Sequence, residues 1–185
     1  MAEARACTAC AAHLPLGPRP VFRLSPTARL LIVGQAPGTK VHESGVPWND
    51  RSGDRLRQWM AIGRDDFYDA ARIAILPMGL CYPGRLKNGG DAPPRPECAP
   101  LWHARLLALL PRVELTLLVG AYAQGRYLEG KASMTEQVRD FRRHLPRFLP
   151  LPHPSWRTTA WERKNPWFGA EVLPALRREV ERLAG

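Results

Sequence analysis

The sequence lacks any long run of apolar residues. Its first stretch, MAEARACTACAAHLPL, contains no apolar segment of the length that a secretory signal needs, and no later stretch approaches the roughly 20 apolar residues of a membrane span. We therefore expect a cytoplasmic protein with no membrane partner. Internal repeats and low-complexity tracts are also absent, and 185 residues suffice for one domain with an ample core.

Acidic residues are scarce relative to basic ones. The chain has 17 Asp and Glu against 27 Lys and Arg, which gives a formal net charge of +10. Such an excess favours a polyanionic partner, because Lys and Arg neutralise phosphates and release counterions. A basic protein without such a partner would have the same composition, so charge alone leaves both interpretations open.

Cysteine is scarce as well, with four in the chain. Cys7 and Cys10 form a C-x-x-C pair, and Cys81 and Cys98 are the other two. Cytoplasmic thiols stay reduced, so four cysteines suggest metal binding or catalysis before disulfides. Four thiolates suit an iron–sulfur cluster and a tetrahedral zinc equally well, and unligated buried cysteines are a third option.

The most informative segment is RLLIVGQAPG, residues 29–38. Residues 30–33 have the pattern of a short buried parallel strand, and the loop after it is bounded by Gly34 and Gly38 and stiffened by Pro37. Ligands of open α/β sheets bind where the chain leaves the carboxyl ends of such strands. An ordinary strand-to-helix turn would have the same pattern.

A similar arrangement recurs near the other end, in LPHPSWR, residues 151–157. An apolar approach again ends in a rigid polar turn, here with His153 between two prolines. Between these two segments, strands alternate with helices, which predicts an α/β fold: a three-layer α/β/α sandwich with a central, mainly parallel four-stranded sheet. We expect the other strands at residues 72–78, 113–120 and 148–151, and helices at 52–62, 97–110, 121–128 and 170–183.

GQAPG early and HPS late together resemble the two signature motifs of the uracil-DNA glycosylase superfamily, and the cysteine spacing resembles its iron–sulfur members, families four and five. The resemblance implies a single domain over residues 1–185 and a monomeric DNA-repair enzyme. Such an enzyme flips deoxyuridine out of uracil-containing DNA and hydrolyses its N-glycosidic bond. It also implies a [4Fe-4S] cluster, with structural zinc as the alternative, and its ligands would be Cys7, Cys10, Cys81 and Cys98.

The same resemblance assigns roles to individual residues. Gly34 and Gln35 would present backbone groups to uracil and to the attacking water. Trp48 would stack on the flipped base, and His153 would donate a hydrogen bond to the departing uracil anion. Trp156 and Arg157 lie where relatives push a side chain into the gap left by the flipped base. The residues expected to contact substrate are Gly34, Ala36, Pro37, Gly38, Trp48, Ser155 and Arg157.

Two departures from the family pattern affect the chemistry. Neither motif supplies a carboxylate to position water, so Asp50 is the first candidate, as in the family-five pattern, and His42 is the alternate base or a phosphate contact. Asp50 could instead cap the helix that begins near Ser52. The uracil-binding asparagine of many relatives is also missing, because residues 77–80 are Pro-Met-Gly-Leu. A glycosylase for another deaminated base such as hypoxanthine, or a non-hydrolytic uracil-DNA-binding iron–sulfur protein, therefore remains open.

Basic and aromatic residues also alternate in TTAWERKNPWF, residues 158–168. Arg163 and Lys164 would neutralise the DNA backbone while the aromatics stack on unpaired bases. Trp167 and Phe168 could equally well serve to anchor the last helix to the sheet. The Gly/Pro-rich loop between Cys81 and Cys98 carries further positive charge.

Overall fold

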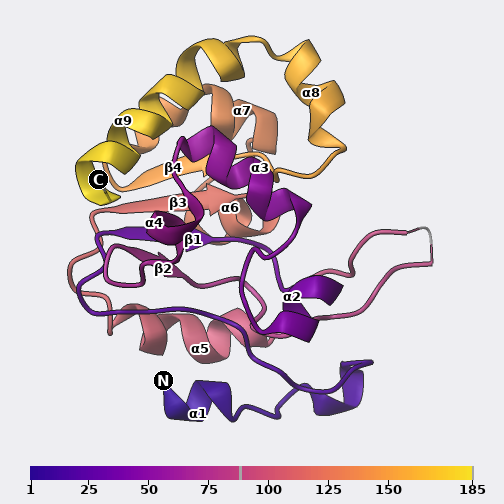
Figure 1. The fold of residues 1–185 in the computed structure, drawn as a ribbon. Helices are drawn as coiled ribbons and strands as arrows, with labels where there is room; N and C mark the ends of the chain where they lie inside the picture. Colours follow the sequence, from indigo (N-terminus) through magenta and orange to yellow (C-terminus); the bar gives the residue numbers. More distant parts are fainter. Residues whose placement is uncertain (88, 185) are drawn as a thin grey trace.

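A sheet of four parallel strands lies at the centre of the computed structural model, which describes residues 1–87 and 89–184 (Figure 1). The strand order is β2-β1-β3-β4. Leu30 pairs with Ile73 on one side and with Leu115 on the other, and Thr116 pairs with Phe148. All four strands were predicted: β1 (Leu30–Val33), β2 (Ile73–Ile75), β3 (Leu115–Val119) and β4 (Phe148–Leu151).

The strands are buried on both faces, as expected for a parallel sheet covered by crossover helices. In β1, Leu30 and Ile32 point into one hydrophobic cluster, whereas Leu31 and Val33 point into the other. Each of these four residues is at most 1% exposed. Because the side chains on both faces of β1 are buried in a core, every residue of the strand is apolar, and apolar and polar residues do not alternate.

One core is covered by α3, α4, α7 and α9, with α8 at the end of this layer (Figure 1). The last helix was predicted at residues 170–183, and four apolar residues that recur along it at helical spacing are all buried: Val172, Leu176, Val180 and Leu183. Trp161 packs edge-on against Trp167 and Phe168, so these aromatics anchor the end of the chain. The bounds are α3 (Arg51–Met60), α4 (Arg64–Tyr68), α7 (Met134–Arg139), α8 (Thr158–Lys164), a π-helical turn (Phe168–Val172) and α9 (Leu173–Ala184).

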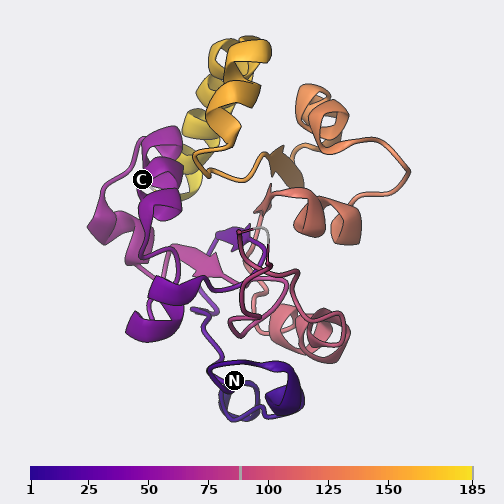
Figure 2. The same ribbon diagram turned by 90° about the vertical axis from the view of Figure 1, so that its right-hand side faces the viewer.

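The opposite core is covered by α1, α5 and α6, which confirms the three-layer α/β/α arrangement (Figure 2). Each of these helices contributes a buried residue to the cluster that contains Leu31 and Val33. These residues are Ala4 in α1, Trp102 in α5 and Ala123 in α6. Within the described residues, no helix combines the length and the apolar character needed to cross a membrane. The bounds are α1 (Ala2–Arg5), α5 (Cys98–Leu107) and α6 (Ala121–Tyr127), with short 3-10 turns at Ala11–His13 and Phe141–His144.

Residues 39–54 are polar and rich in turn residues, which predicts one irregular loop, and the structure shows that this prediction is wrong. Helix α2 (Thr39–Ser44) occupies its first part and ends at Gly45, whose φ of 69° closes the helix in the left-handed conformation. The helix has six residues, and Val41 is the one that is buried. One apolar residue cannot form the repeating pattern by which a helix is recognised in a sequence. Helix α7 was missed as well, although Ser133 and Glu136 form a capping box at its start.

Candidate active site

A pocket of about 80 Å³ opens at the edge of the sheet where β1, β2 and β4 end. This volume is several times the minimum of roughly 10–15 Å³ for one water molecule. Its wall brings together residues that are more than a hundred positions apart in the chain. The predicted site residues that line it are Gly34, Gln35, Ala36, Pro37, Gly38, Trp48, Asp50 and His153.

The loop after β1 is hydrogen-bonded to the segment that follows β2. The carbonyl groups of Gly34 and Gln35 accept hydrogen bonds from the N–H groups of Met78 and Gly79, both at 2.9 Å. Within the described residues, the N–H groups of Gln35 and Ala36 have no hydrogen-bond acceptor. Two backbone donors at a pocket wall are therefore available to an oxygen atom of a ligand.

Trp48 forms another part of the wall. Its φ of 57° is rare for a bulky residue, and the surrounding structure fixes it. The carbonyl oxygen of Trp48 lies so close to Gly53 that a Cβ atom there would come within 1.8 Å of it. The indole ring centre lies 5.8 Å from that of His153. The indole thus presents an aromatic surface beside the histidine.

Asp50 has two roles in the local geometry. Its Oδ1 accepts a hydrogen bond from the N–H of Gly53 at 2.8 Å, so the capping interpretation is confirmed for α3. Its Oδ2 faces Gly38, 3.9 Å from the position that a Cβ atom would take there. One oxygen is therefore committed to the helix while the other faces the pocket.

His153 follows β4 and is held by its own backbone. Its carbonyl accepts hydrogen bonds from the Ser155 N–H at 2.8 Å and from the Thr158 hydroxyl. Burial lowers the pKa of His153, and the negative charge of Asp50 opposes this shift. The imidazole is therefore neutral at neutral pH, with one ring nitrogen as donor and the other as acceptor.

Three predicted site residues are not part of the pocket wall. His42 lies on α2 with its ring centre 5.9 Å from that of Tyr82, and its Nδ1 is buried without a partner among the described residues. Ser155 accepts a hydrogen bond from Arg55 through its carbonyl. Arg157 is exposed, with its guanidinium 5.4 Å from the ring centre of Trp156, which is itself 78% exposed.

Sequence reasoning missed Asp91, which also lines the pocket. It lies at the surface in the loop between β2 and α5, a segment interpreted above only as a source of positive charge. Partial burial of its carboxyl raises the pKa of Asp91; Arg85 opposes this shift, and Asp50 adds to it. No motif or spacing marks this residue, because its position depends on how the loop folds back.

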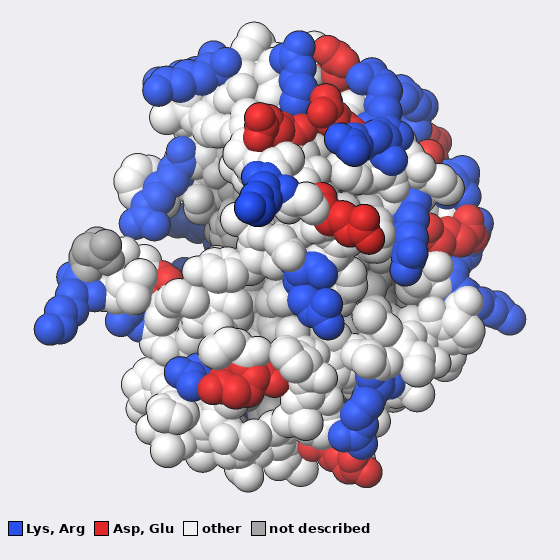
Figure 3. All heavy atoms as spheres, turned by 180° about the vertical axis from the view of Figure 1, so that it is seen from behind, with Lys and Arg blue, Asp and Glu red and all other residues white. Residues whose placement is uncertain are grey.

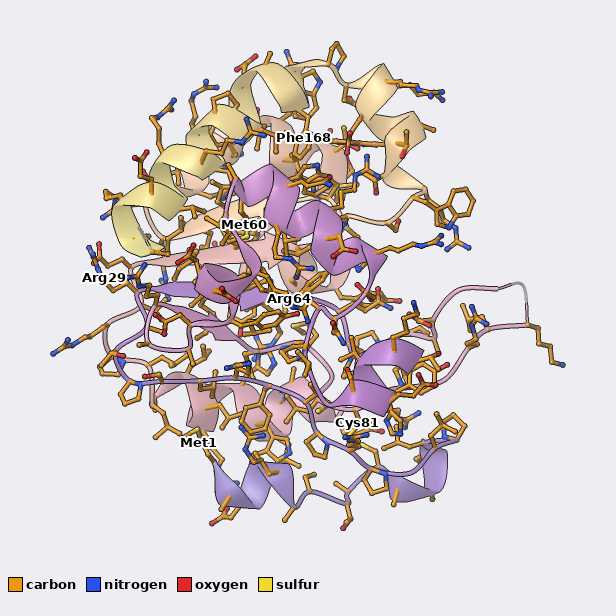
Figure 4. The ribbon with its side chains drawn as sticks, viewed as in Figure 1. Met1, Arg29, Met60, Arg64, Cys81 and Phe168 are labelled. Carbon is orange, nitrogen blue, oxygen red and sulfur yellow. The ribbon has the colours of Figure 1, made fainter. Side chains whose placement is uncertain are left out.

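The four cysteines line a second, smaller pocket together with Arg95 and Trp102. The Trp102 indole N–H donates to Cys7 Sγ at 3.2 Å, and the Leu80 N–H donates to Cys98 Sγ at 3.3 Å. Burial raises the pKa of Cys98 to about 11. Cys81 belongs to the segment between β2 and α5, and in Figure 4 it lies between α2 and the N-terminal segment.

The donor set is four thiols around one pocket, which fits both an iron–sulfur cluster and a tetrahedral zinc ion. Among the described residues, no three His, Cys, Asp or Glu side chains converge closely enough to hold one metal ion. Four sulfurs line this pocket, and two of them accept N–H hydrogen bonds.

Residues 22–177 match the family model described as the uracil DNA glycosylase superfamily. The matched region begins before β1 and ends within α9, so it contains both signature segments and every residue of the pocket wall except Val21. It also contains Cys81 and Cys98. Cys7 and Cys10 lie outside it, and the match therefore leaves the role of the cysteines untested.

Proposed function

The protein belongs to the uracil-DNA glycosylase superfamily and is a DNA glycosylase, and we propose that its substrate is deoxyuridine in DNA, from which it releases uracil by hydrolysis. The observation that carries this proposal is the facing pair of Trp48 and His153 in a pocket with two available backbone N–H groups. Recognition of a planar base with carbonyl oxygens requires an aromatic surface that stacks on the base. It also requires hydrogen-bond donors to the oxygens, here a neutral imidazole and two backbone N–H groups.

The base must leave the helix to reach this pocket. Its glycosidic bond is inaccessible in a duplex, so the nucleotide is flipped out and the base is tested by its edge and its faces. In the proposed complex, Trp48 stacks on one face. His153 donates to the base oxygen on which negative charge develops as the C–N bond breaks, and Asp50 orients the attacking water.

Positive charge around the pocket supports binding of a DNA strand. A surface depression lined by Lys40, Arg51 and Ser52 adjoins the pocket at Asp50. Arg85 and Lys87 are exposed on the loop between β2 and α5, which projects from the molecule (Figures 1 and 3). Elsewhere on the face in Figure 3, basic and acidic side chains alternate. Phosphates would therefore approach the pocket between the projecting loop and α2.

The experiment that tests this function is cleavage of oligonucleotides containing uracil, hypoxanthine or xanthine, with alkali treatment to reveal abasic sites. We expect the fastest cleavage with uracil. Faster cleavage of hypoxanthine DNA would favour the second candidate function, for which Pro77 in the pocket wall is the supporting observation, because relatives use an asparagine in this segment. A covalent adduct, or binding without cleavage, would contradict a hydrolytic glycosylase.

We also propose that Cys7, Cys10, Cys81 and Cys98 hold a [4Fe-4S] cluster. Its role when bound is structural, because it would join the N-terminal segment to both ends of the loop that carries Asp91. The shared pocket and the two N–H···S hydrogen bonds support this proposal.

The purified protein is therefore expected to be yellow-brown, with iron and sulfide in equal amounts. Cys98→Ala should lose the colour and reduce the folded yield, since metal-binding energy is also folding energy. Leu101→Ala, an exposed position on the same helix, is the matched control. A colourless protein with stoichiometric zinc would contradict the cluster.

A further inference from the structure

Asp91 is brought to the pocket by contacts of its loop. The Ala92 N–H donates to the Gly84 carbonyl at 2.8 Å, which turns the chain back on itself. The side chain of Gln35 then donates through Nε2 to the Ala92 carbonyl at 3.2 Å. The loop is thus tied to the glycine-bounded loop after β1, and the Asp91 carboxylate lies at the pocket opening.

Asp91 and Asp50 face the same space above Gly38. The position that a Cβ atom would take at Gly38 lies 3.3 Å from Asp91 Oδ2 and 3.9 Å from Asp50 Oδ2. Asp50 already uses its other oxygen to cap α3. The Asp91 side chain accepts no hydrogen bond from the part of the chain that the structure describes. A water molecule above Gly38 would therefore be within reach of both carboxylates.

The location of Asp91 relative to a bound nucleotide follows from connectivity. If the base fills the pocket, its glycosidic bond points toward the opening, because the sugar remains part of the DNA strand. C1′ then lies at the pocket opening, where Asp91 meets solvent. We propose that Asp91 is a second catalytic carboxylate, which together with Asp50 holds the attacking water above Gly38. This inference rests on the proposed glycosylase function.

The electrostatic surroundings suit a proton acceptor. Partial burial raises the pKa of Asp91, Arg85 and Arg157 lower it, and Asp50 raises it, while His153 lies across the pocket. A carboxylate with a raised pKa is a stronger base near neutral pH. In the proposed step, the C1′–N bond breaks with its electrons on the base and a C1′–O bond forms from water. The water proton passes to Asp91 and then to solvent, which protonates the released base.

The direct test is Asp91→Asn, assayed with enzyme in excess over labelled uracil DNA. We expect cleavage about tenfold slower, less than the roughly 10²-fold of a sole general base, because Asp50 still faces the water. In the wild type, the rate should fall as pH drops through the raised pKa of Asp91, and the variant should lose that part of the profile. DNA affinity should not weaken, since a negative charge has been removed. Asp65→Asn, an exposed position on α4, is the matched control.

Gly38→Ala provides a second test that leaves both carboxylates in place. Gly38 has φ −83° and ψ 178°, which alanine adopts without strain, yet the added methyl group would lie 3.3 Å from Asp91 Oδ2. We expect slower cleavage with an unchanged melting temperature. A Gly38→Ala variant as active as wild type would overturn the shared water site.

Three other results are decisive. Wild-type rates for Asp91→Asn at every pH would overturn the assignment. So would a slow Asp91→Ala beside a fully active Asp91→Asn, because Asp91 would then act as a hydrogen-bonding reader of the base. A wild-type enzyme that cleaves none of the three damaged bases would overturn the proposed function itself, and this inference with it.

Discussion

Replacing His153 with alanine is expected to lower the single-turnover rate of uracil release by about 10²–10³, the range for removing one preorganised donor to a developing anion. The imidazole lies beside Trp48 in the pocket and its backbone is fixed by Ser155 and Thr158, so the donor is positioned before substrate binds. DNA affinity should barely change, because the contact strengthens only as the C–N bond breaks. Enzyme in excess over labelled DNA isolates this step from product release.

The pH dependence of this effect follows from the direction of the pKa shift. Burial lowers the pKa of His153, so the imidazole is already neutral at pH 7 and a further rise in pH removes no proton from it. The ratio of wild-type to His153→Ala rates should therefore stay constant from neutral to alkaline pH. A ratio that falls as pH rises would mean that the protonated form of His153, an imidazolium ion, stabilises the departing base. His144→Ala, which changes a histidine outside the pocket wall, is the control.

The parts of the fold that the sequence predicts are those encoded by short-range patterns. Residues 30–33 and 148–151 are apolar runs that end in Gly or Pro, and both ends of such a run are visible without knowledge of the fold. Parallel pairing then brings the carboxyl ends of β1 and β4 to one edge of the sheet. This is why Gly34 and His153, far apart in the chain, could be assigned to one site.

The remaining parts depend on contacts that no local pattern encodes. Asp91 reaches the pocket because Gln35 binds the Ala92 carbonyl, an interaction across 57 positions of sequence. Trp48 shows the same limit. Its neighbours in the sequence are polar and give no sign of packing with the core, yet the indole is half-buried and contacts the cluster that contains Trp59. Burial of an aromatic side chain is a tertiary property, and a local window cannot reveal it.

Asp50 combines a structural and a proposed chemical role, and two substitutions separate them. Asn caps a helix as well as Asp does, so Asp50→Asn should preserve the hydrogen bond to the Gly53 N–H and the free energy of unfolding. Asp50→Ala removes the cap as well, and should lower the free energy of unfolding by about 1 kcal/mol. Both variants lack the carboxylate that faces Gly38.

The single-turnover rate of Asp50→Asn is expected to fall by roughly 10²-fold or more. This loss is larger than the one expected for Asp91→Asn, because Asp50 also stabilises the positive charge that develops on the sugar. A change in His153 does not explain such a loss. Asp50 raises the pKa of His153, so its removal lowers that pKa further and leaves the imidazole neutral at pH 7. A normal melting temperature together with slow cleavage would therefore assign the loss to the missing charge. If Asp50→Asn cleaves at the wild-type rate and Asp50→Ala is merely less stable, Asp50 is a helix cap alone, and water activation belongs to Asp91.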